Sequence, residues 1–522
     1  MKQPLRGTLL LLVFFVVFLS GCADAVGFLL PEKETEPERV TSYEITIPIE
    51  KVRTLNPVVS KDEDTYYLSR LLYDGLFTLD EDLAAEPLLV ETFSYSEDSL
   101  TLTMTLKESI LWQDGTPLSG NDVKFSIEAY QAAAASNLTL YNSHVEGVKS
   151  VRVTADKTVV VTFKDPNHAA KENFIFPILP SHLHRRPADL VKDIEGFIPV
   201  GTGLYRYEPG ESGDKFSLKG NTYRESAPTN VLNVKVIPGK EEAVNLFTTG
   251  EINMTLLKTV NRETLVGTME VDIIAFPSNE AEVLGFNSRS EAVRDPLVRQ
   301  AIATAINNEA LIESCYFNNG VLNDSLYFPG YLGIDSQKDA YPFDPEFAKK
   351  LLKKAEVGTL SLDIVVNQND PSRVLGGQLI KGDLERIGIN ANLVELNWTE
   401  YVEALGKGNY DIYLGGFRFR DTYDLRPILH SSYAPVTGYS NTSLDVLLDK
   451  IQSGIDKEAK ASLYRSAREI LNTDLPYYTL LYKTYGIAVP TTFEGKVEPK
   501  FFDIYNGCES WSLEIYLDKE PG

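Results

Sequence analysis

Two short patterns in the sequence bring together residue types that act in catalysis or metal binding. Ser212 and Lys215 have the Ser-x-x-Lys spacing of penicillin-recognising enzymes, but they lie in a Gly-rich turn, and the companion Ser-Asp-Asn and Lys-Thr-Gly motifs are missing. His182 and His184 could share one face of a strand and bind a metal, but no cysteine or carboxylate nearby in the sequence completes a ligand set. We therefore expect both histidines to be loop residues beside Pro180.

Other catalytic signatures are absent from the sequence. It contains no His-Glu-x-x-His zinc motif, no Gly-x-Ser-x-Gly nucleophile motif and no Walker phosphate-binding loop. We therefore predict that the protein is not an enzyme and has no catalytic residue, no bound metal and no cofactor. A binding protein needs instead a cleft between rigid parts, lined by aromatic and charged side chains. The 27 tyrosines and 24 phenylalanines could supply such a lining.

Cys22 is the residue for which covalent chemistry is expected. The segment before it begins with Lys2 and Arg6 and continues with an apolar run over 9–19, which is the layout of an export signal. That run is about twelve residues long, too short for the roughly 20 residues that span a bilayer. The tetrapeptide Leu19-Ser20-Gly21-Cys22 resembles the bacterial lipobox, in which the cysteine thiol takes a diacylglycerol and becomes the mature N-terminus.

Residues 1–22 are therefore predicted to be a lipoprotein signal peptide, with Cys22 as the site of lipidation. We expect an extracytoplasmic protein, anchored by acyl chains such as palmitate to the outer face of the cell membrane, or on the periplasmic side in a Gram-negative bacterium. Residues 23–40 are charged, rich in proline and poor in periodic apolar residues. That composition predicts a disordered tether between the lipid and the folded body.

Length and charge limit the remaining alternatives. A single core rarely grows beyond about 250–300 residues, so a chain of 522 residues is expected to form two or more domains. The formal net charge of −24 argues against nucleic acid, whose phosphates require a basic surface. Export makes a disulfide between Cys315 and Cys508 chemically feasible, but we favour two separate thiols.

Hydrophobic periodicity and capping residues predict the elements that would position a binding site. Alternating apolar residues indicate strands over 43–49, 100–106 and 157–163. Ser119 with Asp122, Asp295-Pro296 and Asp344-Pro345 each predict the start of a helix, and the helix after Asp295 is expected to end just before Asn319-Gly320. Helices over 372–387 and 399–405 flank a strand over 389–396. The stretch from about 283 to 480 therefore has the alternation typical of an α/β domain.

Several motifs, in order along the chain, resemble those of the extracellular solute-binding proteins of family 5, the oligopeptide- and dipeptide-binding receptors of ABC importers. The most specific is the block Trp112-Gln113-Asp114-Gly115-Thr116-Pro117-Leu118, which continues into Asp122-Val123-Lys124-Phe125-Ser126. The others are Leu55-Asn56-Pro57, Tyr73-Asp74-Gly75-Leu76, Glu86-Pro87-Leu88-Leu89, Gly201-Thr202-Gly203-Leu204-Tyr205, Gly250-Glu251-Ile252-Asn253, Phe286-Asn287, Val298-Arg299-Gln300-Ala301-Ile302, Ala305-Ile306-Asn307, Gly388-Ile389, Trp398, Tyr410-Asp411 and Asp474-Leu475-Pro476. Leu204 and Asn253 depart from the family, which more often has Pro and Asp there. We expect Gly201 and Gly203 to serve tight backbone turns.

The resemblance implies an α/β, two-lobed periplasmic-binding-protein-like fold of the class II type with an extra inserted subdomain. Lobe I would comprise residues 41–282 and 481–522, including the inserted subdomain at about 66–190, and lobe II would comprise 283–480. Two crossovers, near Phe286 and near Leu480–Tyr482, would hinge the lobes. A ligand buried between them would shift the population towards a closed state, which docks on the permease subunits. We expect a monomer.

The resemblance also indicates candidate ligand-binding residues. Peptide receptors of this family hold the peptide backbone by strand-like hydrogen bonds, and a buried carboxylate pairs with the peptide ammonium, because a lone buried charge is costly. Asp421 best matches that carboxylate, and Asp424 is the rival. Arg418 stands where a Trp often precedes the carboxylate, a departure that bears on the ligand, and Arg418, Arg420 and Asp421 could instead pair with one another. Trp398 matches an aromatic lining residue or, equally, a core residue at a helix start.

The sequence therefore predicts a lipid-anchored, substrate-binding component of an ABC importer, with peptides as the expected ligands. The same architecture could serve another solute, such as a nickel complex or an oligosaccharide, although the low histidine content disfavours a direct metal site. An exported hydrolase or transferase, and a signalling or chaperone role without transport, remain as alternatives from other classes. No nucleic acid partner is expected.

Overall fold

The computed structural model describes residues 38–167, 170–192, 194–258, 265, 269–323, 325–334, 340–419, 423–452 and 457–517. The predicted signal peptide, Cys22 and most of the predicted tether lie outside these ranges. No helix within them is both long enough and apolar enough to cross a membrane. Residues 38–42 and 514–517 form a small unit by themselves, in which β1 (Glu38–Ser42) pairs with β20 (Ser512–Leu517) and Arg39 lies 3.6 Å from Glu514. All other described elements belong to the unit from Tyr43 to Leu513.

We keep the names lobe I and lobe II for the residue ranges predicted from the sequence. Lobe I contains a four-stranded sheet in the order β2-β11-β10-β9, in which β2 and β11 are parallel and the other pairs are antiparallel. These strands span Glu44–Glu50, Val231–Ile237, Lys215–Gly220 and Tyr205–Pro209. Helix α2 (Glu63–Leu72) follows β2, and helix α5 (Lys240–Thr248) follows β11 and leads to β12 (Thr255–Leu257). The short strand β19 (Phe493–Glu494) and the 3₁₀ helix η6 (Cys508–Ser510) come from the C-terminal tail.

The range predicted as an inserted subdomain has its own antiparallel sheet, in the order β5-β6-β8-β7. Its strands span Val90–Tyr95, Thr101–Leu106, Thr158–Phe163 and Val148–Ala155. Helix α3 (Gly120–Ala134) contacts β7 and β8, and the short helix α4 (Asn142–Glu146) packs against α3. A hairpin of β3 (Phe77–Leu79) and β4 (Ala85–Pro87) precedes the sheet, and three 3₁₀ helices follow it: η1 (Ala170–Asn173), η2 (Ser181–Leu183) and η3 (Pro187–Asp189).

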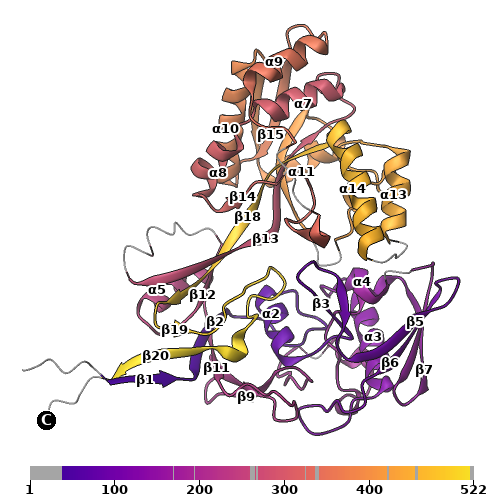
Figure 1. Ribbon diagram of the computed structural model, residues 1–522, viewed down its shortest axis with the longest axis vertical. Helices are drawn as coiled ribbons and strands as arrows, with labels where there is room; N and C mark the ends of the chain where they lie inside the picture. Colours follow the sequence, from indigo (N-terminus) through magenta and orange to yellow (C-terminus); the bar gives the residue numbers. More distant parts are fainter. Residues whose placement is uncertain are drawn as a thin grey trace, which may run out of the picture. The chain divides into compact units, whose positions relative to one another are not determined.

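Two long antiparallel strands carry the chain between the lobes (Figure 1). Strand β13 (Val271–Phe286) pairs with β18 (Tyr477–Pro490), and the register between them breaks between Pro277 and Ala281. On one side of the break β18 also pairs with β12, and on the other side β13 pairs with β17 (Ile412–Arg418). The two crossovers predicted from the sequence therefore correspond to one strand pair with an irregular region in its middle.

Lobe II is built on the continuation of that sheet, whose order is β12-β18-β13-β17-β15-β16, with β14 (Gly320–Val321) beside β18. Strands β15 (Ser361–Asn367) and β16 (Asn390–Leu396) are parallel to each other, and β15 is parallel to β17, as expected for strands joined by helices. The helices are α7 (Pro296–Ala305), α8 (Asn308–Tyr316), α9 (Pro345–Lys354), α10 (Pro371–Arg386), α11 (Trp398–Lys407), α12 (Arg426–Leu429), α13 (Thr442–Gln452) and α14 (Lys457–Asp474). Two 3₁₀ helices, η4 (Tyr331–Gly333) and η5 (Ser431–Tyr433), complete the lobe.

The predicted capping residues begin the predicted helices, but one of these helices ends earlier than expected. Ser119 and Asp122 form a capping box at the start of α3, and the Asp295 and Asp344 carboxylates accept hydrogen bonds from the first turns of α7 and α9. The single helix expected from Asp295 to Asn319 is wrong. The chain turns extended at Ile306, and the Asn307 side chain accepts from the Ala310 N–H at 3.0 Å to begin α8. A second good N-cap within the apolar run therefore ends one helix and starts another.

Gly201 and Gly203 have a different role from the one expected, since neither has a positive φ. A Cβ atom on Gly201 would lie 1.8 Å from the backbone oxygen of Leu72, at the end of α2. The Gly203 N–H donates to that same oxygen at 3.0 Å. Glycine is therefore required by the close approach of two backbones and not by a turn.

The remaining candidate reactive groups are also placed by the structure. Cys315 and Cys508 are buried free thiols, which confirms the expectation of two separate cysteines. His182, in η2, has its Nε2 2.7 Å from Oδ2 of Asp114, a carboxylate that is close in space but not in the sequence. Asp114 is 68 residues away in the sequence, so local spacing could not reveal it. Among the described residues, no group of three metal-ligating side chains comes together.

Candidate functional site

A cavity of about 800 Å³ is lined by residues of both lobes. From lobe I, its wall is formed by the end of α4, the end of β8 with the loop that follows it, and the end of η1. From lobe II, it is formed by the end of β17, by residues 424–428 and by the end of α13. A cavity of this size can hold a small organic solute or a short peptide.

Strand β17 contributes an unpaired edge to this cavity. Its pairing with β13 continues to Arg418, whereas its pairing with β15 ends at Leu414. The Tyr401 hydroxyl donates to the Leu414 backbone oxygen at 2.9 Å and so occupies the edge at that point. From there to Arg418, no strand in the described part of the chain pairs with this edge. An extended ligand can therefore add to the sheet through its main-chain N–H and C=O groups.

A glycine keeps this stretch of β17 close to its neighbours. A Cβ atom on Gly416 would lie 2.7 Å from the backbone oxygen of Ala281 and 2.7 Å from Nη2 of Arg373. Any larger residue would push the strand away from β13 or displace the arginine. The position of the unpaired edge therefore depends on the absence of a side chain at Gly416.

Aromatic rings stand on the face of β17 opposite to Arg418. Phe417 and Phe419 line the cavity, with ring centroids 5.9 Å apart. Phe419 stacks on Tyr423 at 4.9 Å, and Phe417 meets Tyr477 edge-on at 5.3 Å. Sequence analysis did not single out any of these rings. The signal was the alternation of Phe and Arg over 417–420, which places both phenyl rings on one face of a strand.

Two ion pairs hold charged side chains at the cavity wall. Asp424 accepts from Nε and Nη2 of Arg426 at 3.0 and 2.8 Å, and both residues line the cavity. Glu172 of lobe I accepts from Nζ of Lys460 of lobe II at 2.6 and 2.7 Å. Burial works against the charged form of Lys460, but the Glu172 carboxylate raises its pKa above the usual lysine value. Lys460 therefore keeps its charge, and its pair with Glu172 joins η1 to α14 across the two lobes.

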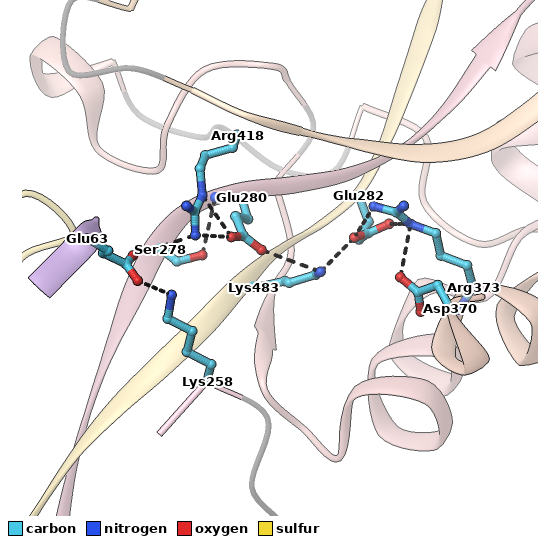
Figure 2. Close-up of polar contacts among 9 residues, drawn as sticks. All are labelled: Glu63, Lys258, Ser278, Glu280, Glu282, Asp370, Arg373, Arg418 and Lys483. Carbon is cyan, nitrogen blue, oxygen red and sulfur yellow. Dashed lines mark hydrogen bonds and ion pairs between the residues drawn. The ribbon is translucent and has the colours of Figure 1, made fainter. Parts of the chain in front are cut away.

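Arg418 contacts two carboxylates that are distant from it in the sequence (Figure 2). Its Nε and Nη2 donate to Oε1 of Glu280, its cross-strand partner on β13, at 3.0 and 2.6 Å. Its Nη2 also lies 3.6 Å from Oε1 of Glu63, in the first turn of α2 in lobe I. Glu63 in turn forms an ion pair with Lys258, which follows β12. Arg420 and Asp421 lie outside the described residues, so the alternative that Arg418 pairs with them stays a prediction.

The charges continue along β13 and β18 into lobe II. Lys483 lies 3.5 Å from Glu280 and 2.9 Å from Glu282, whose side chain is only 1% exposed. Arg373 of α10 donates to both carboxylate oxygens of Glu282 at 2.8 and 3.0 Å. Burial opposes the charged form of Lys483, but Glu282 and Glu280 raise its pKa. Burial likewise opposes the charged form of Glu280, yet Lys483, Tyr485 and Arg418 lower its pKa, so both partners stay ionised.

Of the predicted ligand-binding residues, some line the cavity, one does not, and one lies outside the described residues. Asp421 and Arg420 lie outside the described residues, so the role of Asp421 stays a prediction. Asp424 and Arg418 both line the cavity. Trp398 does not line this cavity; it is 59% exposed at the start of α11 and stacks on Tyr401 with ring centroids 6.0 Å apart. Its interpretation as a core residue is therefore wrong, whereas contact with a ligand at that position stays a prediction.

A cavity lined from two lobes that are joined by a pair of crossover strands defines a solute-binding protein. Residues 84–438 match the family model of the bacterial extracellular solute-binding proteins, family 5, and the chain belongs to this family. It is 25% identical to the oligopeptide-binding protein AppA of Bacillus subtilis, over 98% of this chain and all of the relative.

Solved structures show the same two-lobed periplasmic-binding fold. The ABC transporter substrate-binding protein CtaP of Listeria monocytogenes is similar with a TM-score of 0.75 and 21% identity, over 91% of this chain and 100% of that chain. NikZ of Campylobacter jejuni, solved in complex with Ni(L-His), is similar with a TM-score of 0.65 and 21% identity, over 91% of this chain and 100% of that chain. The family and fold class expected from the sequence motifs are thereby confirmed.

Proposed function

We propose that this protein is the lipid-anchored receptor of an ABC importer, which captures peptides between its two lobes and delivers them to the membrane permease. One observation carries the peptide assignment: among the described residues no strand pairs with the β17 edge beyond Leu414, at the point where Phe417 and Phe419 face the cavity. Main-chain groups are common to all peptides, so a free strand edge binds an extended peptide independently of its sequence. The similarity to an oligopeptide-binding relative along almost the whole chain supports the same assignment.

The lipid anchor and the place of action belong to this proposal. The motif Leu19-Ser20-Gly21-Cys22 supports acylation at Cys22, and the charged tether of 23–40 would let the folded body reach a permease in the same membrane. No catalytic role is assigned, because the proposal requires binding and release of an unchanged ligand.

Native mass spectrometry of the purified full-length protein tests the ligand class directly, because a tightly bound solute can survive purification. We expect adducts with peptide masses, which disappear after partial unfolding and dialysis. Calorimetry of the emptied protein with a random pentapeptide mixture should then show stoichiometric binding. Intact recovery of the mixture after prolonged incubation would agree with a receptor, whereas shortened peptides would indicate the alternative hydrolase and overturn the proposal.

A nickel complex is the second candidate ligand, because a fold neighbour was solved with Ni(L-His). The described cavity wall offers carboxylates such as Asp165 and Asp449 but neither histidine nor cysteine. A metal would therefore have to arrive with its own organic ligands. Titration with Ni²⁺ and L-histidine together, in place of the peptides, distinguishes the two: saturable binding of the complex with no peptide binding would replace the peptide assignment.

A further inference from the structure

The eight charged side chains drawn in Figure 2 form one alternating chain, which runs from α10 of lobe II to α2 of lobe I. Its members in order are Asp370, Arg373, Glu282, Lys483, Glu280, Arg418, Glu63 and Lys258. Acids and bases are equal in number, so every charge is next to an opposite one. Partly buried charges are tolerated when they are paired in this way, and an unpaired one is costly.

The pairs at the two ends of this chain do not depend on the contact between Arg418 and Glu63. Glu282 is the last lobe I residue on the crossover strand β13, where β13 already pairs with β17 of lobe II, and it accepts two hydrogen bonds from Arg373 of lobe II at 2.8 and 3.0 Å. Glu63 and Lys258 form a pair inside lobe I, where Glu63 also accepts from the Tyr67 hydroxyl at 3.3 Å. Neither pair requires helix α2 to lie next to β17.

The connection between the ends is made in the region where the register of β13 and β18 breaks. Glu280 lies within that break, between Pro277 and Ala281, where the regular pairing of the two crossover strands is interrupted. Arg418 bridges this carboxylate to Glu63 of lobe I. Because Glu280 and Arg418 face each other on paired strands, the contact between Arg418 and Glu63, at 3.6 Å, is the link in the chain that would be lost if α2 moved away from β17.

Arg418 is also the member of the chain that reaches the cavity. Its neighbours Phe417 and Phe419 line the cavity with it, and its backbone belongs to the unpaired edge of β17. A ligand bound along that edge would order this end of the strand and thereby hold the guanidinium in place. Because both carboxylates already face the guanidinium, the ligand does not need to supply an anion to it.

From this geometry we propose that Arg418 is a positioning residue that couples ligand binding to lobe closure, through its contact with Glu63. The inference rests on the proposed function for the nature of the ligand, but the contact itself acts on the lobes with or without one. Its loss changes the fraction of closed molecules, and the apparent affinity changes by the same factor.

The variants Glu63→Gln and Arg418→Met test this in the lipidated full-length chain in detergent. Fluorophores are attached at Lys149→Cys on β7 and Lys353→Cys on α9, both exposed, while the native Cys315 and Cys508 are buried. Single-molecule energy transfer then measures the closed fraction without ligand and with a random pentapeptide mixture. The matched control is Glu403→Gln, which removes a carboxylate from an exposed ion pair with Lys407 within α11.

We expect Glu63→Gln to lower the ratio of closed to open molecules about fivefold, at the upper end of what a partly exposed ion pair supplies. The apparent affinity should fall by the same factor, and Glu403→Gln should change neither quantity. Combining Glu63→Gln with Arg418→Met should add little to the effect of Arg418→Met, because both remove the same contact. Arg418→Lys, which keeps the charge, should restore part of the closed fraction. If Glu63→Gln does not fold, Glu63→Asp serves instead, since the shorter side chain withdraws the carboxylate.

Two results would overturn the inference. One is a closed fraction in Glu63→Gln equal to that of the control. The other is a large loss of affinity in Arg418→Met with unchanged affinity in Glu63→Gln, which would make Arg418 a direct ligand partner. If no variant, including the unchanged chain, binds the peptide mixture, the proposed function fails, while the closed fractions measured without ligand still decide the role of Arg418.

Discussion

The buried ion pair between Lys460 and Glu172 joins the two lobes, so a substitution in it should have a large effect on ligand binding. Lys460 belongs to α14 of lobe II and Glu172 to η1 of lobe I, and their side chains are 6% and 16% exposed. Both carboxylate oxygens accept from the ammonium, at 2.6 and 2.7 Å. Separation of the lobes would return both groups to water, so the pair matters only for the closed arrangement.

The variant Lys460→Met removes the cation and leaves the carboxylate at the same place. Removing one partner of a buried pair typically costs about 3–5 kcal/mol, and we take about 3 because Glu172 borders a cavity that admits water. That free energy corresponds to roughly a 150-fold loss in the ratio of closed to open molecules, and in apparent ligand affinity. The double variant with Glu172→Gln should recover most of the loss, because no uncompensated charge remains.

Lys457, one turn earlier on α14, provides the matched control. It pairs with Asp80 and Asp82 of lobe I but is 40% exposed, so Lys457→Met should cost no more than about 1 kcal/mol. Calorimetry with the random pentapeptide mixture measures all three variants against the unchanged chain. The reasoning is refuted if Lys460→Met binds as tightly as Lys457→Met, or if the double variant is as weak as Lys460→Met alone.

The remaining predictions concern the anchor, the ligand, the thiols and the hinge. Cys22→Ala should abolish labelling by radioactive palmitate and leave the signal uncleaved, which gel electrophoresis of the membrane fraction would show; persistent labelling would place the lipid elsewhere. Asp421→Asn should weaken binding of peptides with a free amine by orders of magnitude but hardly change binding of N-acetylated ones, as measured by calorimetry; loss in Asp424→Asn instead would move the assignment to that carboxylate. Burial raises the pKa of the Cys315 thiol to about 11 and raises that of Cys508 further, so at pH 8 both should resist iodoacetamide until the protein is unfolded; rapid labelling of the native protein, followed by mass spectrometry, would contradict this. Lys483, Tyr485 and Arg418 hold the pKa of Glu280 below its ordinary value, against the effect of burial. Glu280 therefore contributes stability above the ordinary glutamate pKa of about 4.3, and this stability is lost as the pH falls further. On acidification, the thermal midpoint of Glu280→Gln should decrease less than that of the unchanged chain.

The parts of this structure that the sequence predicted are those with local causes. An aspartate followed by proline is a local signal for the start of a helix, and Asp295 and Asp344 each begin one. Alternating apolar residues gave the strands at 101–106 and 158–163 within one residue. The misplaced end of the helix after Asp295 had a local cause too, since Asn307 is itself a good cap that was overlooked within an apolar run.

The interactions at the candidate site have no such local cause. Lys460 and Glu172 are 288 residues apart, and Arg418 and Glu280 are 138 apart. Nothing in the residue types distinguishes these carboxylates from the many others in an acidic chain, and only the meeting of two lobes selects them. His182 and Asp114 are likewise far apart in the sequence, by 68 residues, and no spacing rule connects them.

The pairing of these charges has a consequence for what the cavity can recognise. Arg418 and Arg426 both reach its wall, but each already faces a carboxylate at 2.6 and 2.8 Å. A ligand anion would have to compete with those carboxylates, so these arginines add little net attraction for it. The wall also offers the faces of Phe417 and Phe419 and the β17 edge beyond Leu414, with which no strand of the described chain pairs. Main-chain hydrogen bonds and apolar contact fix the direction of an extended ligand while leaving its side chains largely unspecified, which is the behaviour of a receptor for many related solutes.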